Sequence, residues 1–215
     1  TKSNFIMNKP INLQGDNSTG LYVENSGEGL KNPLNTVRFV IGAKDNTTIP
    51  TYVPKNSLLN PANIKKAYHN KEYNDENLSE EIFGVILKNP DAELHLKVPQ
   101  LEIERFAKKS VGLYTREGLI KVTEGNIEIK GGENNTAISA YGGNIDYTGN
   151  ITIKESSLDG DTGNKKGIKN LAVLGISSSS RISHVKINGD INTDTRDTIT
   201  VYSINSKIDL NGKLN

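Results

Sequence analysis

The sequence contains no cysteine and no tryptophan, and aromatic residues make up only 6% of it. The lack of cysteine excludes a disulfide framework and a thiolate metal site. No apolar run approaches the roughly 18 residues of a membrane-spanning helix. The formal net charge of +1 gives no basic field that would attract nucleic acid. We therefore expect neither a nucleic acid partner nor a membrane span within this chain.

What the sequence does contain is one phrase repeated four times in its C-terminal half. The copies read LIKVTEGNIEIK, NIDYTGNITIK, HVKINGDIN and KIDLNGKLN, and a glycine divides each into two short strands (Gly125, Gly149, Gly189 and Gly212). The first two and the last two glycines are about two dozen residues apart, a period typical of stacked repeats. The longer middle spacing comes from a polar run at 156–169. Repeats that lengthen only in polar loops behave as coils of a solenoid.

The apolar residues of each copy fall on every second position, so they share one face of their strand. A third strand-like piece follows the glycine: TAISA, AVLG or TITV. Strands this short cannot bury a face alone, so the coils must stack around one interior column. The sequence therefore predicts an all-β fold, a right-handed parallel β-helix in which Ile127, Ile151 and Ile191 lie one above another.

The N-terminal half has similar strands but is interrupted. We expect the first coils at 1–43 and further coils at 93–215, because GLYV at 20–23 is echoed by GLYT at 112–115. The intervening residues 44–92 are far more than one coil requires. We read them as a small α-helical excursion from the side of the β-helix.

Two short helices are expected in that excursion. The first covers 62–70. For the second, Asn77 followed by Glu80 resembles a capping box. Leu78, Ile82, Val85 and Ile86 then fall on one face with period 3.6, and we expect them to pack onto the coil beneath together with Phe83.

Four motifs could suggest a catalytic, metal or phosphate-binding site but are better explained structurally. Asn192–Asp194 copies the Asn-Thr-Asp triplet of polygalacturonase-type glycosidases, but the further carboxylates that such enzymes need are missing. The loop DGDTGN at 159–164 begins like a calcium loop, yet no acidic residue closes it. The histidines (His69, His95 and His184) lack ligand spacing. The glycine pairs at 131–132 and 142–143 precede no helix and are read as corners. We therefore expect no catalytic residue, metal or cofactor.

The excursion carries the candidate binding residues. Tyr68, His69 and Tyr73 have polar neighbours, which favours their exposure. Aromatic side chains stack on sugars or anchor protein contacts. We therefore predict that ligand binding involves Tyr68, His69 and Tyr73.

The repeated GxIxI phrases, the GLY-type third strands and the absence of polar caps resemble the passenger of a type V autotransporter. The amino-acid composition, rich in Asn, Ile and Lys, is most similar to that of the very large fusobacterial surface adhesins. The resemblance implies secretion across two membranes, a place at the bacterial cell surface, and anchoring in the outer membrane through a translocator domain outside this chain. It also implies attachment to host cell-surface glycans or proteins, or to a partner bacterium.

We therefore expect a non-catalytic adhesin segment that forms part of a longer chain. Two alternatives stay open. The first is a polysaccharide-active β-helix enzyme, either a lyase or a glycosidase, which would carry two carboxylates in a groove. The second is a structural spacer without a ligand.

Overall fold

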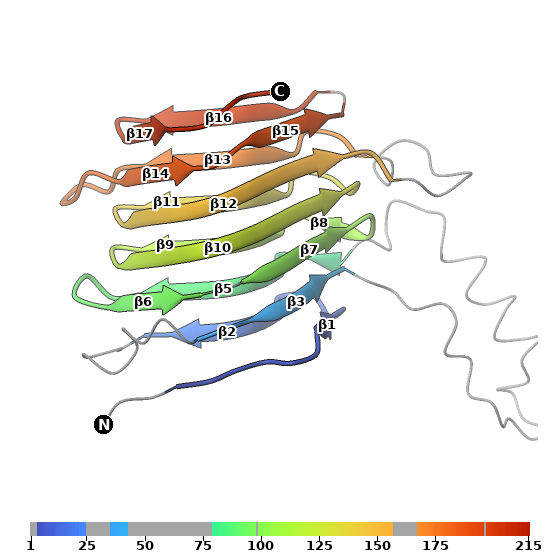
Figure 1. Ribbon diagram of the computed structural model, residues 1–215, viewed down its shortest axis with the longest axis horizontal. Helices are drawn as coiled ribbons and strands as arrows, with labels where there is room; N and C mark the ends of the chain where they lie inside the picture. The colour runs from blue at the N-terminus through green and yellow to red at the C-terminus, as the bar shows by residue number, and fades with distance from the viewer. Residues whose placement is uncertain (1–3, 25–34, 43–78, 98, 157–166, 196) are drawn as a thin grey trace, which may run out of the picture.

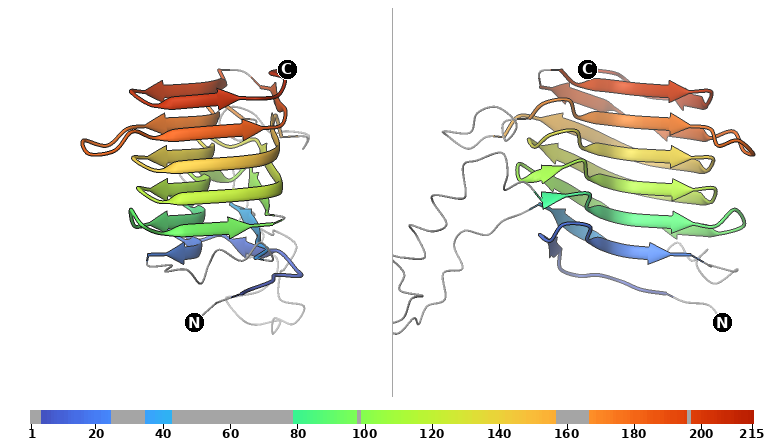
Figure 2. Two further views of the ribbon diagram at one scale, coloured as in Figure 1. Left: turned by 60° about the vertical axis from the view of Figure 1, so that its left-hand side comes forward. Right: turned by 180° about the vertical axis from the view of Figure 1, so that it is seen from behind.

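The computed structural model describes residues 4–24, 35–42, 79–97, 99–156, 167–195 and 197–215. These residues form an all-β protein in which every strand pairing is parallel. Two large sheets lie face to face, and the chain passes from one to the other and back (Figures 1 and 2). This arrangement is compatible with a parallel β-helix.

The nine-stranded sheet runs in the order β1-β3-β7-β10-β12-β14-β17, with β6 also paired to β10 and β15 to β12. Its strands are β1 (Ile11–Leu13), β3 (Arg38–Ile41), β6 (Glu93–Leu96), β7 (Gln100–Glu104), β10 (Leu119–Lys130), β12 (Asn144–Lys154), β14 (His184–Asn188), β15 (Ile191–Asp194) and β17 (Lys207–Leu210).

The six-stranded sheet runs in the order β16-β13-β11-β9-β5-β2. Its strands are β2 (Thr19–Val23), β5 (Phe83–Lys88), β9 (Val111–Arg116), β11 (Thr136–Tyr141), β13 (Leu171–Ile176) and β16 (Ile199–Ile204). A short two-stranded sheet pairs β4 (Ser79–Glu80) with β8 (Ala107–Lys108).

We call one passage through the nine-stranded and then the six-stranded sheet a rung. The rungs follow each other in chain order, from the first (β1, β2) and second (β3, β5) to the fifth (β12, β13) and sixth (β14, β15, β16). Neighbouring rungs are hydrogen-bonded, so the chain climbs the stack by one strand at a time (Figure 1). The four repeated phrases are four successive levels of the nine-stranded sheet.

The predicted isoleucine column is confirmed. Ile127 pairs in register with Ile151, and Ile151 pairs with Ile191. All three side chains are at most 1% exposed. Polar residues alternate with them on the outer face, as the period of two predicted.

The repeated glycines form a second column because the backbones of neighbouring rungs nearly touch there. Gly149 lies in register with Gly125, and a Cβ atom on Gly149 would come within 2.0 Å of the Gly125 carbonyl oxygen. Gly149 also has a φ of +142°, a conformation that side chains disfavour. Each phrase therefore needs its glycine at the point where the strand bends.

Buried polar side chains bind the corners that enter the six-stranded sheet. The Asn135 Oδ1 atom accepts a hydrogen bond of 3.0 Å from the Ser110 amide, and Asn170 Oδ1 accepts one of 3.0 Å from the Asn135 amide. The Nδ2 group of Asn135 donates to the Ala107 carbonyl at 3.0 Å. This ladder satisfies backbone groups that burial would otherwise leave unpaired.

The second predicted helix is wrong. Residues 79–80 and 83–88 are strands β4 and β5, and β5 pairs with both β2 and β9. Ile82 and Val85 are buried, as expected of core residues, but they project from an extended chain. Pairing with a strand on each side outweighed a weak local helical pattern. The β-structure therefore resumes by Ser79, inside the excursion predicted at 44–92, and the part of the chain that the structure describes contains no helix. The first predicted helix, at 62–70, lies outside the described residues.

Candidate binding groove

A groove of about 440 Å³ lies where the six-stranded sheet turns back into the nine-stranded sheet. Four of the turns stacked at this end of the rungs border the groove, and they differ in length. The two central turns have two residues each, at 117–118 and 142–143. The turns on either side are longer, at 89–92 and 177–183. The groove is the hollow that the short turns leave between the long ones.

The short turns are kept short by their backbone geometry. Glu117 and Gly142 have φ values of +66° and +61°, which reverse the chain within two residues. A Cβ on Gly143 would lie 2.8 Å from the Gly118 carbonyl oxygen, so the two turns stack in close contact. The prediction that the pair Gly142–Gly143 forms a corner is confirmed.

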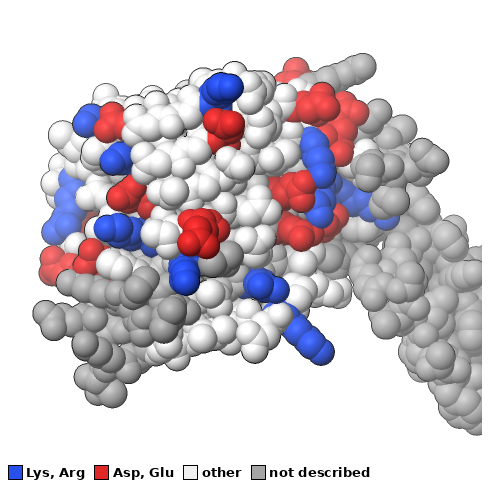
Figure 3. Space-filling view, viewed as in Figure 1, with Lys and Arg blue, Asp and Glu red and all other residues white. Residues whose placement is uncertain are grey.

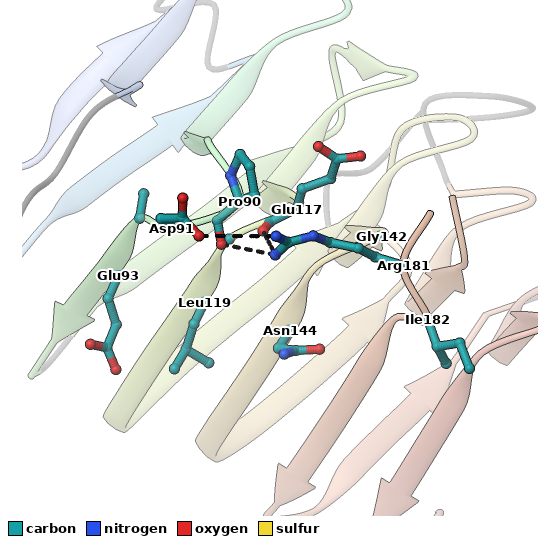
Figure 4. A pocket seen from close by; sticks show the side chains of 11 residues that line it. Pro90, Asp91, Glu93, Glu117, Leu119, Gly142, Asn144, Arg181 and Ile182 are labelled. Carbon is teal, nitrogen blue, oxygen red and sulfur yellow. Dashed lines mark hydrogen bonds and ion pairs between the residues drawn. The ribbon is translucent and has the colours of Figure 1, made fainter. Parts of the chain in front are cut away.

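Arg181 forms one wall of the groove. Its Nη1 atom donates to the Pro90 carbonyl at 3.0 Å and to the Glu117 carbonyl at 3.4 Å. Its Nη2 atom lies 3.9 Å from the Asp91 carboxylate. The side chain thus reaches from one long turn across the short turns to the other long turn (Figure 4).

Serine hydroxyls hold the turn that carries Arg181. The Ser178 hydroxyl accepts a hydrogen bond of 3.1 Å from the Arg181 amide. At the base of the turn, the Ser183 hydroxyl donates to the Ile176 carbonyl at 2.5 Å, and the Ser183 amide donates to the Ser177 hydroxyl at 3.1 Å. The guanidinium group is therefore positioned before any ligand arrives.

The floor of the groove is a row of residues at the starts of three neighbouring strands. Glu93, Leu119 and Asn144 lie in register on β6, β10 and β12 (Figure 4). Ile182, which is 73% exposed, completes the opposite side. With Asp91 and Glu117, the lining offers three carboxylates, one guanidinium, one amide and four apolar side chains, those of Pro90, Ala92, Leu119 and Ile182. Such a surface provides several hydrogen-bond acceptors and donors with an excess of negative charge.

The candidate binding residues from the sequence, Tyr68, His69 and Tyr73, lie outside the described residues, as do 159–164 of the predicted polar loop. Their role stays a prediction. The other two histidines lie apart on the outer face of the nine-stranded sheet. His95 is half-buried with Nε2 3.3 Å from Glu93, and His184 Nε2 lies 2.7 Å from Asp209. Among the residues that the structure describes, no group of three or more metal-ligating side chains comes together.

The Asn192–Asp194 triplet forms the last three residues of strand β15 and is not the turn we expected. Asn192 lies in register with Thr152, and Asp194 with Lys154. Asn192 Oδ1 accepts a hydrogen bond of 2.8 Å from the Asn215 amide group. The triplet therefore bridges neighbouring rungs.

Carboxylates do gather on the outer face of the nine-stranded sheet, around Lys130. The Lys130 Nζ atom lies 2.6 Å from Glu102, 3.5 Å from Glu104 and 3.4 Å from Glu128. Glu128 also pairs with Lys154. Figure 3 shows this sheet's outer face, with acidic and basic side chains intermixed over it.

These ion pairs shift the pKa values of the group in different directions. Partial burial works to raise the pKa of Glu128, but hydrogen bonds and charge from Lys154 and Lys130 outweigh it and lower that pKa. Burial raises the pKa of Glu104, and nearby Lys130 only partly offsets this. Partial burial works to lower the pKa of Lys130, but the surrounding carboxylates outweigh it and raise that pKa above the ordinary value. The cluster acts as a network of ion pairs across rungs.

Sequence reasoning missed the groove because its parts are distant in the chain. Arg181 and Pro90 are 91 positions apart. One signal was available: the serine-rich run SSSSR at 177–181 lies in a seven-residue turn, whereas the turns at 117–118, 142–143 and 205–206 have two residues each. A long turn beside short ones marks the point where a stacked repeat departs from regularity.

Comparisons of the chain with protein-family models, with curated protein sequences and with solved structures gave no match. In the described ranges, no helix is long and apolar enough to span a membrane.

Proposed function

We propose that this chain is a right-handed parallel β-helix that forms part of a bacterial surface adhesin, and that the groove beside Arg181 binds a neutral sugar unit of a glycan. The protein acts without catalysis. The stack supplies a stiff support, and the irregular turns supply the recognition surface.

The observation that carries this proposal is the groove itself. It lies where turns of unequal length leave a cavity of about 440 Å³ between them. That volume is within the range of roughly 300–1,000 Å³ that is typical of small-ligand sites. The regular outer face of the nine-stranded sheet consists of charged and polar rows that pair with each other.

The lining favours a neutral polyhydroxylated ligand over an anionic one. Asp91, Glu93 and Glu117 accept hydrogen bonds from hydroxyl groups and repel a carboxylate or sulfate. Leu119 and Ile182 offer apolar contact to the face of a sugar ring. Arg181 keeps its guanidinium group at the wall, where it donates to ring or hydroxyl oxygens.

The cellular setting follows from the resemblance to type V autotransporter passengers, particularly the large fusobacterial adhesins. In this proposal the chain is displayed on the bacterial cell surface and is held in the outer membrane by a translocator domain outside this chain. Its partner is a glycan on a host cell or on another bacterium.

A glycan array probed with the labelled protein tests this function. We expect binding to neutral glycans, and a loss of that binding in Arg181→Ala. Arg38→Ala is the matched control, because Arg38 also donates to a backbone carbonyl, that of Asn8 at 3.4 Å, but lies outside the groove. Circular dichroism checks that both variants keep their β-structure.

The array also separates the alternatives. Binding that survives Arg181→Ala but disappears when Tyr68, His69 and Tyr73 are replaced by alanine assigns recognition to those three residues instead of the groove. Release of sugar fragments from a bound polysaccharide would overturn the non-catalytic reading in favour of the enzyme. Absence of binding to any glycan would favour the spacer.

A further inference from the structure

The outer face of the six-stranded sheet has three outward rows, of which two are uncharged and the third carries Lys88 and Arg116. Two outward rows cross all six strands in register. The first row is Thr19, Phe83, Val111, Thr136, Leu171 and Ile199, and the second is Tyr22, Ile86, Tyr114, Ser139, Leu174 and Tyr202. These twelve residues include no charged side chain.

This face differs from the outer face of the nine-stranded sheet, where rows alternate in charge. There Lys121, Asp146, Lys186 and Asp209 follow one another in register. A stack that met only water would carry polar rows on both outer faces. The contrast indicates that one face is built for contact with another surface.

The apolar side chains reach the surface. Tyr22, Tyr202 and Ile199 are 49%, 49% and 51% exposed. Phe83 and Tyr114 are half-buried and lie against each other, with ring centroids 5.6 Å apart. Contiguous apolar patches of several hundred Å² on a protein surface mark interaction sites.

The relief of the face is self-complementary. Strand β11 carries the small residues Thr136 and Ser139, which are only 8% and 6% exposed between their larger neighbours. Strand β9, beside it, carries Val111 and Tyr114 in the same two rows. A shallow furrow along β11 thus lies next to a ridge along β9.

We propose that two copies of this chain pack through these faces about a twofold axis that runs parallel to the strands between β9 and β11. The ridge of β9 then enters the furrow of the partner subunit's β11, and the reverse contact follows by symmetry. Strand β5 faces the partner's β13, and β2 faces the partner's β16. All six strands of each copy are covered.

The area supports this occupant. Six strands about 4.8 Å apart, with about six residues each at about 3.3 Å, span roughly 570 Å² per copy, and this span includes the third outward row with Lys88 and Arg116. The two copies together bury about 1,100 Å², which reaches the size of about 1,000 Å² expected of a specific interface. The flat packing of two sheets is the geometry of a β-sandwich. A sugar is a poorer occupant, because the aliphatic residues Ile86, Leu171 and Leu174 offer it no hydrogen bonds.

Analytical ultracentrifugation over a concentration series tests the dimer. We expect the unmodified chain to dimerise and Leu174→Lys to weaken association by roughly a hundredfold, because the axis brings the substitution into the interface twice. Thr152→Lys is the control: it places the same residue in the same rung but on the other sheet, and should leave the dimer unchanged. A monomer at all concentrations overturns the proposal, as does a dimer that tolerates Leu174→Lys.

Cross-linking tests the register, since the chain has no cysteine of its own. Ile86 and Leu174 are three rungs apart in one copy but face each other across the proposed axis. A mixture of Ile86→Cys and Leu174→Cys proteins should therefore be joined by a short bis-maleimide, while either protein alone should not. Equal cross-linking of each protein alone contradicts this arrangement.

Discussion

Replacing Ile151 by alanine is the sharpest test of how the stack is held together. The Ile151 side chain is fully buried between Ile127 below it and Ile191 above it. Both neighbours are fixed by parallel backbone pairing, so they cannot move in to fill the space. The substitution should therefore cost the full range seen for such cavities, about 2–5 kcal/mol of unfolding free energy.

That loss is large against the ~5–15 kcal/mol of stability that a typical domain has. Urea unfolding followed by circular dichroism measures it directly, and the slope with urea should stay constant because the same surface is exposed. Thr152→Ala provides the matched control. Thr152 is the next residue along β12, points outward, and should change stability by less than about 0.5 kcal/mol. Equal losses in the two variants would refute the assignment of inner and outer faces.

Four further outcomes are expected. Gly149→Ala should destabilise the protein strongly, because its methyl group would meet the Gly125 carbonyl oxygen at 2.0 Å; a melting temperature equal to that of the unmodified chain would disprove the close approach. Glu128→Gln should destabilise at pH 7 and have little effect in acid, because a lowered pKa stabilises the fold only above the unfolded pKa, and this contribution disappears as pH falls through the folded pKa. Glu104→Gln should have the opposite sign, a gain at pH 7 that fades in acid, because its pKa is raised; pH-dependent urea titrations of both variants check the two signs. Shortening 156–169 to the length of the loop between β10 and β11 should leave the fold intact, as measured by circular dichroism, because loop length costs little entropy.

The core of the fold was predictable because the interior residues of a stacked repeat recur at fixed intervals in the sequence. The alternation around Ile151 and the spacing of the glycines specify both the inner face and the level of each strand. The Gly142–Gly143 turn was also predictable, because a glycine pair between two strand patterns is typical of a tight turn.

The segment at 78–86 could not be assigned from its own pattern. Ile82, Val85 and Ile86 satisfy a helical spacing, yet Val85 and Ile86 also project to opposite sides of a strand. Only the presence of β2 and β9 on either side decides between the two. No local rule contains that information.

The groove and the uncharged rows of the six-stranded sheet escaped prediction because each is made by neighbours across rungs. Arg181 gains its place from turns that belong to other rungs. In those rows, each strand contributes only two outward uncharged residues, which is unremarkable in one strand. The pattern exists only when six strands are aligned.

A distance between labels on distant rungs tests the stacked register most directly, and both the groove and the dimer face depend on that register. His95 and Asp209 lie in one outward row, four pairings apart through Lys121, Asp146 and Lys186. Spin labels on cysteines at these two positions, diluted with unlabelled protein, should give one narrow distance near the ~19 Å set by four strand spacings. A broad distribution, or a mean distance above about 30 Å, would contradict the parallel stack.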